Sequence, residues 1–176
     1  MDSHTPAANR TQRLFLAMWP DDDARQQLVN HADQWIWPDG CVRYLPEDLH
    51  LTLHFLGPVK ADRVADIVAL AAVPFKPFTL VLDQPTGWPH GMAVLCMSQV
   101  PASLQALYER LGDALRRLDL PVETRPFQPH VTLARRATDA IPPERPQPVV
   151  WRARRYVLVV STGGMAPRYR LIHQYE

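Results

Sequence analysis

The sequence predicts an α+β fold in which mainly antiparallel sheets are combined with a few helices. Strand-like and helix-like segments intermix without the regular alternation of a doubly wound parallel sheet. The 18 prolines and the Gly-containing turns punctuate these segments at short intervals. A length of 176 residues, with 47% hydrophobic and 21% charged residues, fits one domain with room for two lobes.

The first half of the chain begins with "RLFLAMW" (13–19), a compact apolar run that ends at Pro20 and predicts a buried strand. Residues 21–36 predict a helix, because aspartates cluster at its start and apolar residues recur at helical spacing. After a turn at 38–40, we expect a short strand at 42–44 and a longer one from His50 to Gly57.

The middle of the chain predicts a helix at 61–72, two strands at 77–84 and 92–100, and a breaker-rich loop between those strands at 85–91. The clearest helix spans 101–120. Its expected inner stripe consists of Leu104, Leu107, Leu111, Leu115 and Leu118.

The last part of the chain returns to strands at 130–136, 151–162 and 168–176, with a turn at Gly163-Gly164 and a proline-rich surface loop at 141–148. Residues 1–11 are polar and are expected to form a flexible extension of a domain that spans 1–176. They contain no apolar signal segment, which favours a cytoplasmic location. Cys41 and Cys96 have no zinc-site spacing and are expected to be buried or half-buried thiols in a reducing compartment.

The net charge of +1 argues against a protein that wraps long duplex nucleic acid through a broad basic surface. A small phosphate pocket remains compatible with this charge, because it needs only a few local donors.

The stretch "HLTLHFLG", from His50 to Gly57, places polar residues at every second position. In a regular strand, His50, Thr52 and His54 would share one face, and Phe55 would point into the core on the other. Eighty residues after His50, "PHVTLARR" repeats the pattern with His130 and Thr132. An internal duplication that gives two similar half-sites facing each other explains both copies.

Chance gives about 0.36 His-x-Thr triplets in a chain of this composition, so one copy is unremarkable and the second calls for an explanation. Two imidazoles on opposite sides of a phosphate suit phosphoester cleavage, one as base for water and one as acid for the leaving oxygen. Threonine hydroxyls on the same face can donate hydrogen bonds to the non-bridging oxygens. This chemistry requires no metal and no cofactor.

The paired tetrads resemble those of the two-histidine (2H) phosphoesterase superfamily. The segments "RLFLAMWP", "LPEDLHLTLHFLG", "RPFQPHVTLARR" and "YVLVVS…RYRLI" are similar, in this order, to the bacterial RNA 2′,3′-cyclic phosphodiesterases, also called 2′-5′ RNA ligases. The resemblance implies a two-lobed, pseudo-symmetric fold whose sheets face a central cleft, with helices outside. It also implies metal-independent hydrolysis of an RNA 2′,3′-cyclic phosphate to the 2′-phosphate, together with possible reversible 2′-5′ RNA ligation.

By the same resemblance, His50 and His130 become the catalytic pair, and Thr52 and Thr132 hold the phosphate. His50 is assigned as the acid for the 3′ oxygen and His130 as the base for water, although near symmetry allows the roles to exchange. Arg135 matches the family's arginine after the second tetrad.

Strand parity turns Arg135 away from His130 unless a bulge redirects it, and it makes Arg136 the fallback. His54 is expected in the cleft wall or on the surface rather than in catalysis. Tyr44 is a candidate aromatic platform for a base, whereas parity favours the core for Phe55. Three arginines make the late strand basic and offer a guide for an RNA backbone, although a solvated strand face is the favoured interpretation: Arg152, Arg154 and Arg155.

The expected binding partners are RNA 3′ ends or small nucleotides that carry a 2′,3′-cyclic phosphate, with no membrane and no obligate protein partner. Two alternatives stay open. One is a module that binds the terminal phosphate of RNA without turnover. The other is a phosphodiesterase for a small cyclic or 2′-5′-linked nucleotide.

Overall fold

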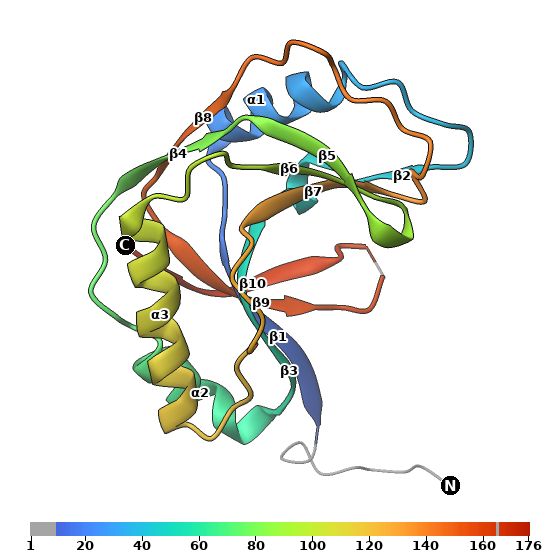
Figure 1. The fold of residues 1–176 in the computed structure, drawn as a ribbon. Helices are drawn as coiled ribbons and strands as arrows, with labels where there is room; N and C mark the ends of the chain where they lie inside the picture. The colour runs from blue at the N-terminus through green and yellow to red at the C-terminus, as the bar shows by residue number, and fades with distance from the viewer. Residues whose placement is uncertain (1–9, 165) are drawn as a thin grey trace, which may run out of the picture.

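The computed structural model describes residues 10–164 and 166–176 and confirms the predicted α+β architecture (Figure 1). Two lobes lie one above the other in Figure 1, and each combines antiparallel strand pairs with helices on its outer side. The terminal lobe carries both ends of the described chain. The central lobe is built mostly from the segments between them.

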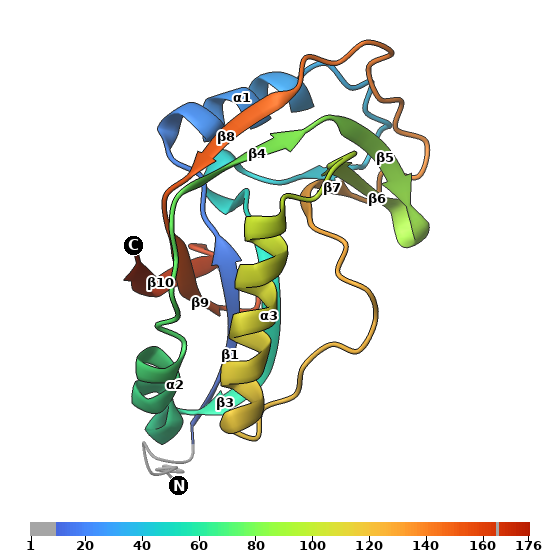
Figure 2. The ribbon, with the colours of Figure 1, turned by 60° about the vertical axis from the view of Figure 1, so that its left-hand side comes forward.

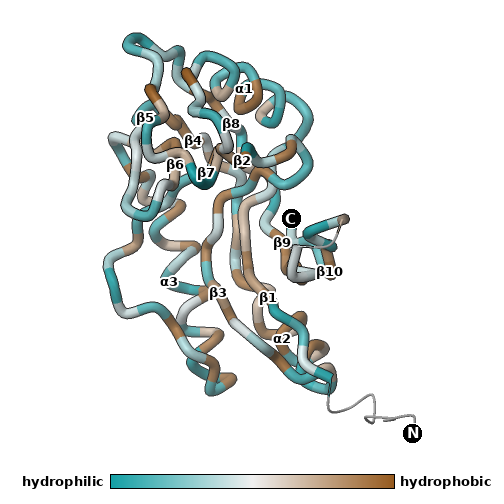
Figure 3. Tube along the Cα trace, turned by 90° about the vertical axis from the view of Figure 1, so that its right-hand side faces the viewer, coloured by the Kyte–Doolittle hydropathy of each residue, from teal (hydrophilic) through white to brown (hydrophobic). Residues whose placement is uncertain are grey.

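The terminal lobe has four strands in the spatial order β10 (Tyr169–Tyr175), β9 (Tyr156–Ser161), β1 (Thr11–Met18) and β3 (Leu51–Lys60). Two helices flank this sheet, as Figure 2 shows: α2 (Val64–Leu70), which follows a 3₁₀ turn at Ala61–Arg63, and α3 (Ala102–Arg117). Four leucines of the predicted stripe on α3 are fully buried, and Leu118 packs against them from the end of the helix. In Figure 3 the tube of α3 accordingly alternates between hydrophilic and hydrophobic positions.

The central lobe contains a sheet of β7 (His130–Arg135), β6 (Met92–Cys96) and β5 (Gln84–Trp88), with the short β2 (Val42–Arg43) paired to β7. A separate pair consists of β4 (Phe78–Leu82) and β8 (Val149–Ala153). Helix α1 (Asp22–Ala32) lies against β8, where the Gln27 amide and the Val150 backbone exchange hydrogen bonds of 2.8 and 2.9 Å. The Asp21 side chain caps α1 by accepting from the Ala24 N–H at 2.9 Å.

The two lobes meet where β3 pairs with β7. Leu51 and Val131 are partners in this antiparallel contact, and both side chains are fully buried. Within the described part of the chain, the contact joins the two lobes into one eight-stranded sheet. An antiparallel pair is related by a local two-fold axis, so this junction also generates the pseudo-symmetry that the duplicated motif predicts.

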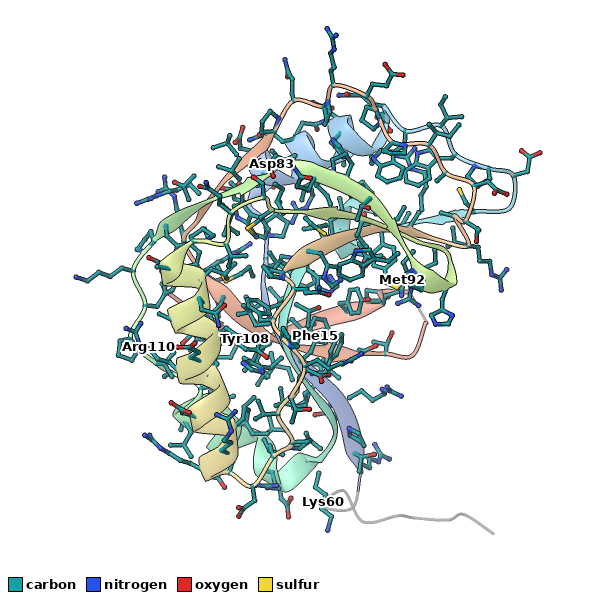
Figure 4. The ribbon with its side chains drawn as sticks, in the orientation of Figure 1. Phe15, Lys60, Asp83, Met92, Tyr108 and Arg110 are labelled. Carbon is teal, nitrogen blue, oxygen red and sulfur yellow. The ribbon has the colours of Figure 1, made fainter. Side chains whose placement is uncertain are left out.

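The sheet of the terminal lobe has a different apolar cluster on each face. Leu14, Leu16 and Met18 point from β1 into the main core, which is shared with the helices. The alternate residues Phe15, Ala17 and Trp19 join Val157 and Val159 of β9 in a smaller cluster on the opposite face. Phe15 lies near the middle of the molecule in Figure 4. The smaller cluster forms the floor on which the candidate site is built.

Two sequence-based expectations about the strands are wrong. The pattern predicts a loop at 85–91, but residues up to Trp88 belong to β5. This strand lies at the edge of the sheet, where Pro85 is tolerated because one side of the backbone needs no partner. The pattern also predicts one strand at 151–162, but the chain divides at Arg154-Arg155 into β8 and β9, which belong to different lobes.

Most of the expected N-terminal extension, residues 1–9, lies outside the described residues. Thr11 is the first residue of β1 and pairs with Lys60 of β3. Among the described residues, no helix is long and apolar enough to cross a membrane.

Leu16 provides a test of the packing, because it is fully buried between β3 and β9 in the sheet of the terminal lobe. Leu16→Ala is expected to lower the free energy of unfolding by about 2–5 kcal/mol, since it removes buried methyl groups and leaves a cavity. Chemical denaturation measures this change. The matched control is Leu171→Ala on β10, whose side chain is 39% exposed; equal effects of the two substitutions would contradict the packing described.

Candidate active site

His50 and His130 are held by the same local geometry. The Nδ1 of His50 lies 2.6 Å from the carbonyl oxygen of Asp48, and the Nδ1 of His130 lies 2.8 Å from that of Gln128. A carbonyl oxygen only accepts, so Nδ1 carries the proton and donates it in both rings. The Nε2 atom of each neutral imidazole is therefore left as the lone-pair atom available for chemistry.

Each imidazole also packs against a tryptophan. Trp19 stacks on His50 with ring centroids 5.1 Å apart and planes 6° apart, and the Trp88 ring centre lies 4.2 Å from that of His130. Phe15 and Tyr169 each pack 5.1 Å from the His50 ring. These contacts restrict both histidines to one orientation.

The β3–β7 register brings the two tetrads together. Leu51 pairs with Val131, so continuing the antiparallel register by one residue each way places His50 opposite Thr132 and Thr52 opposite His130. These four residues share the face opposite to the buried Leu51 and Val131. All four side chains are half-buried. The structure thus brings together the four residues that the duplicated motif indicates.

A β-bulge interrupts each strand at the last residue of its tetrad. In β3, consecutive residues of β1 pair with Thr52 and His54, which leaves Leu53 as the extra residue. In β7, consecutive residues of β6 pair with Thr132 and Ala134, which leaves Leu133 as the extra residue. A bulge reverses the alternation of side chains beyond it.

The bulge in β3 explains why two expectations are wrong. Simple alternation predicts His54 on the face of His50, and Phe55 in the core. Instead, His54 pairs with Leu16 on the main-core side and is buried, whereas Phe55 pairs with Phe15 on the site face and is 72% exposed. His50 and His54 therefore point to opposite faces and do not form a metal pair. The described residues contain no cluster of three His, Cys, Asp or Glu suited to a metal ion.

The bulge in β7 has the matching effect on the arginines. The reversed alternation places Arg135 on the same face as His130. The guanidinium of Arg135 lies 5.4 Å from the centre of the Tyr44 ring. Arg136, the fallback by simple parity, lies outside the strand and is exposed. Its backbone adopts φ 51° just beyond the end of β7.

Arg168 is a site residue that the sequence reasoning missed. Its guanidinium lies 5.0 Å from the Tyr44 ring and 5.3 Å from the Tyr169 ring, so Tyr44 contacts two arginines. A backbone hydrogen bond of 2.9 Å from Thr162 to Arg168 closes the loop between β9 and β10 that carries it. Arg168 is the first residue of the segment "RYRLI" that carries the family resemblance, but its position in the chain does not indicate that its side chain lies beside Tyr44.

The electrostatics keep both imidazoles neutral in the free protein. Burial lowers the pKa of His50 to about 4, whereas the hydrogen bond to the Asp48 carbonyl acts in the opposite direction. The positive charges of Arg168 and Arg135 lower this pKa further, as does the charge of His130 whenever that ring is protonated. Burial also lowers the pKa of His130 below its usual value. An anion bound beside Arg135 and Arg168 would offset their charge and raise the pKa of His50.

A groove of about 510 Å³ extends from the site. Thr52 and Phe55 line it from the terminal lobe, Trp88 and His130 line it from the central lobe, and residues 121–128 form one wall. Three stacked rings support that wall. His54 stacks on Tyr108 at 4.2 Å and donates from Nε2 to the Tyr108 carbonyl at 2.8 Å, and Tyr108 stacks on Phe127 at 4.0 Å.

Two oriented imidazoles and two threonines thus lie on adjacent strands, with two guanidiniums near His50, and these are groups whose chemistry suits a phosphate. The comparisons with known proteins give the family. Residues 20–162 match the family model of the 2′-5′ RNA ligase superfamily, and the chain belongs to this superfamily. The resemblance noted from the sequence is thereby confirmed.

Named relatives define the similarity further. The chain is 36% identical to the RNA 2′,3′-cyclic phosphodiesterase of Escherichia coli (strain K12) over 132 residues, which cover 74% of this chain and 75% of the relative. A crystal structure of a phosphoesterase matches with a TM-score of 0.85 and 29% identity, over 94% of this chain and 98% of that chain. The E. coli LigT complex with 3′-AMP matches over the same shares, with a TM-score of 0.81 and 29% identity.

The effect of Arg168 on His50 can be measured directly. We expect NMR titration of the imidazole nitrogens to give His50 a pKa well below 6.5 in the free protein. Arg168→Met should raise that pKa, because it removes a positive charge that disfavours imidazolium. Arg145→Met, in the exposed 141–148 loop, is the control and should leave it unchanged. An unchanged His50 pKa in Arg168→Met would contradict the electrostatic role of Arg168.

Proposed function

We propose that this chain hydrolyses RNA 2′,3′-cyclic phosphate ends to 2′-phosphate ends by acid–base catalysis between His50 and His130. The observation that carries the proposal is the paired geometry: each imidazole has its Nδ1 bound to the carbonyl two residues earlier, and the β3–β7 register sets the tetrads opposite each other. The naming of the similar E. coli relative as an RNA 2′,3′-cyclic phosphodiesterase supports the same reaction.

In the proposed mechanism, the Nε2 atom of His130 takes a proton from water as the water oxygen forms a bond to phosphorus. The bond from phosphorus to the 3′ oxygen breaks in line, and His50 donates a proton to that oxygen. The products are a 2′-phosphate and a 3′-hydroxyl. Acid–base catalysis of this kind contributes roughly 10²–10⁴ in rate for each group.

The remaining site residues act on the charge of the phosphate. The hydroxyls of Thr52 and Thr132 donate to its non-bridging oxygens and hold the phosphorus between the imidazoles. Arg135, together with Arg168, provides positive charge beside His50. Substrate binding offsets this charge, so His50 gains its proton when the phosphate is in place. The acid is therefore generated where it is needed, and the mechanism requires no metal.

Ligation of two RNA ends uses the same groups. The 5′-hydroxyl of a second RNA end takes the position of water and attacks the cyclic phosphate. The bond from phosphorus to the 3′ oxygen breaks as before, and the product carries a 2′-5′ linkage. The name of the superfamily agrees with this activity. A cytoplasmic location stays a prediction.

The small-nucleotide alternative has one specific observation in its favour. The similar structure of E. coli LigT is described as a complex with 3′-AMP, a mononucleotide. The groove beside His130 is about 510 Å³ and has Phe55 and Trp88 on its walls, which suits a single nucleoside. Substrates of increasing chain length distinguish this alternative from the RNA-end reaction.

The proposed reaction is tested with a short RNA that ends in a 2′,3′-cyclic phosphate, in the presence of a chelator, with separation of the 2′- and 3′-phosphate products. We expect turnover to the 2′-phosphate, because the mechanism expels the 3′ oxygen. Binding of the RNA without any product would favour the end-binding module instead. A 3′-phosphate product would contradict the proposed leaving group.

Substitution of the histidines tests their roles. His50→Ala and His130→Ala should each lower kcat by roughly 10²–10⁴, since each removes one proton-transfer group. His173→Ala is the matched control, because this exposed histidine of β10 lies outside the site. Circular dichroism checks that all three variants are folded. Near-normal kcat in folded His50→Ala and His130→Ala would rule out the acid–base pair.

A further inference from the structure

A second groove is lined in part by Trp19, the residue that packs against His50 in the candidate active site. Its volume is about 430 Å³, and its lining includes Trp19, Arg152, Arg154 and Arg155. Trp19 belongs to both places, because its ring also stacks on His50 at 5.1 Å. The groove is therefore one aromatic side chain away from the candidate catalytic centre. We refer to it as the arginine groove.

The ends of β1 and β9 bring Trp19 and Arg155 to this groove. Met18, at the end of β1, pairs with Tyr156, at the start of β9, so Trp19 and Arg155 are neighbours just beyond these strand ends. Trp19 shares the small cluster that supports His50. In Figure 2 the chain passes from β8 to β9 near the C-terminal end, and this connection carries Arg154 and Arg155. Trp19 thus connects the groove to His50, because its ring lines the groove and stacks on the imidazole.

The charge of the groove is not neutralised by ion pairs. Among the described residues, none of its three arginines forms a salt bridge. Arg155 donates to the side-chain oxygen of Gln174 at 2.7 Å, and Arg152 makes a hydrogen bond of 3.3 Å to Thr79. Two carboxylates also line the groove, so its three arginines leave a net positive charge: Asp21, which caps α1, and Glu176, which accepts from the Gln174 amide. Most guanidinium N–H donors therefore remain available to a ligand.

Guanidinium groups with unused N–H donors can bind phosphate oxygens through two parallel hydrogen bonds. A single-stranded RNA bound with its terminal phosphate between the histidines carries its remaining phosphates at short, regular intervals. We propose that the arginine groove binds a backbone phosphate of the RNA upstream of its cyclic end. This inference rests on the proposed function and deepens it: the substrate is an RNA chain, and mononucleotides use only part of the binding surface.

The test measures binding rather than turnover, so that it remains informative if catalysis fails. The probes are a fluorescent RNA tetranucleotide that ends in a 2′-phosphate and the corresponding nucleoside 2′-phosphate as competitor. We expect the wild-type protein to bind the tetranucleotide roughly tenfold more tightly than the mononucleotide, because each charge-assisted phosphate contact adds affinity. The expected dependence of the affinity on salt is steeper for the tetranucleotide.

The variants Arg154→Gln and Arg152→Gln/Arg154→Gln should bring the ratio of the two affinities close to one. The slope of log affinity against log salt for the tetranucleotide should fall by about 0.7 for each phosphate that an arginine no longer neutralises. Arg145→Gln removes an exposed arginine that lines neither groove, and it should change neither quantity. Thermal unfolding verifies that all variants are folded.

The outcomes separate the two proposals. Equal affinity ratios in Arg152→Gln/Arg154→Gln and Arg145→Gln would overturn the arginine groove, whether or not the protein hydrolyses cyclic phosphates. A ratio close to one in the arginine-groove variants, with an unchanged ratio in Arg145→Gln, supports the groove even if the product assay shows no turnover. Failure of the proposed reaction would be detected only in the product assay, because the binding assay does not measure turnover.

Discussion

The antiparallel contact between β3 and β7 is the interaction on which the rest of the structure depends. Leu51 and Val131 are buried partners at the boundary of the two lobes. Their pairing sets which residues of the two tetrads are neighbours across the strands. Because side chains alternate along a strand, a slip of one residue would turn a complete His-Thr pair away from its partner pair. The burial of two apolar side chains thus determines the geometry of a polar site.

The two bulges show how duplicated strands acquire different functions. Each bulge falls at the leucine that ends a tetrad, and each brings the residue two positions later to the site face. In β3 that residue is Phe55, an exposed ring beside the groove. In β7 it is Arg135, a positive charge near His50. One backbone irregularity, used twice, therefore provides an aromatic surface on one side and a cation on the other.

The surroundings of His50 determine which protonation state its imidazole prefers. Burial among Trp19, Phe15 and Tyr169 disfavours the charged imidazole, and so do the nearby arginines. A phosphate would reverse the second effect while leaving the first in place. The protonation of the site would then depend on the presence of its anion, which links substrate binding to the proposed chemistry.

The sequence by itself determined the α+β class, most of the elements, and the pairing of His50 and Thr52 with His130 and Thr132. These results follow from local properties: hydrophobic periodicity, proline and glycine at turns, and a repeated motif that needs no distant information. Where the strand deviates from regular alternation, the same reasoning failed. Nothing in "HLTLHFLG" indicates that Leu53 is the extra residue. The sequence therefore predicts the wrong face of β3 for both His54 and Phe55.

The tertiary structure alone decided the rest of the site. A bulge is set by the pairing of a strand with its neighbours, as β1 does for β3 and β6 does for β7. Arg168 reaches Tyr44 through a loop that has no sequence relationship to the tetrads. The arginine groove likewise exists because β8 and β9 belong to different lobes, so that the chain between them crosses beside Trp19. Such long-range proximity arises from packing, and no local pattern in the chain encodes it.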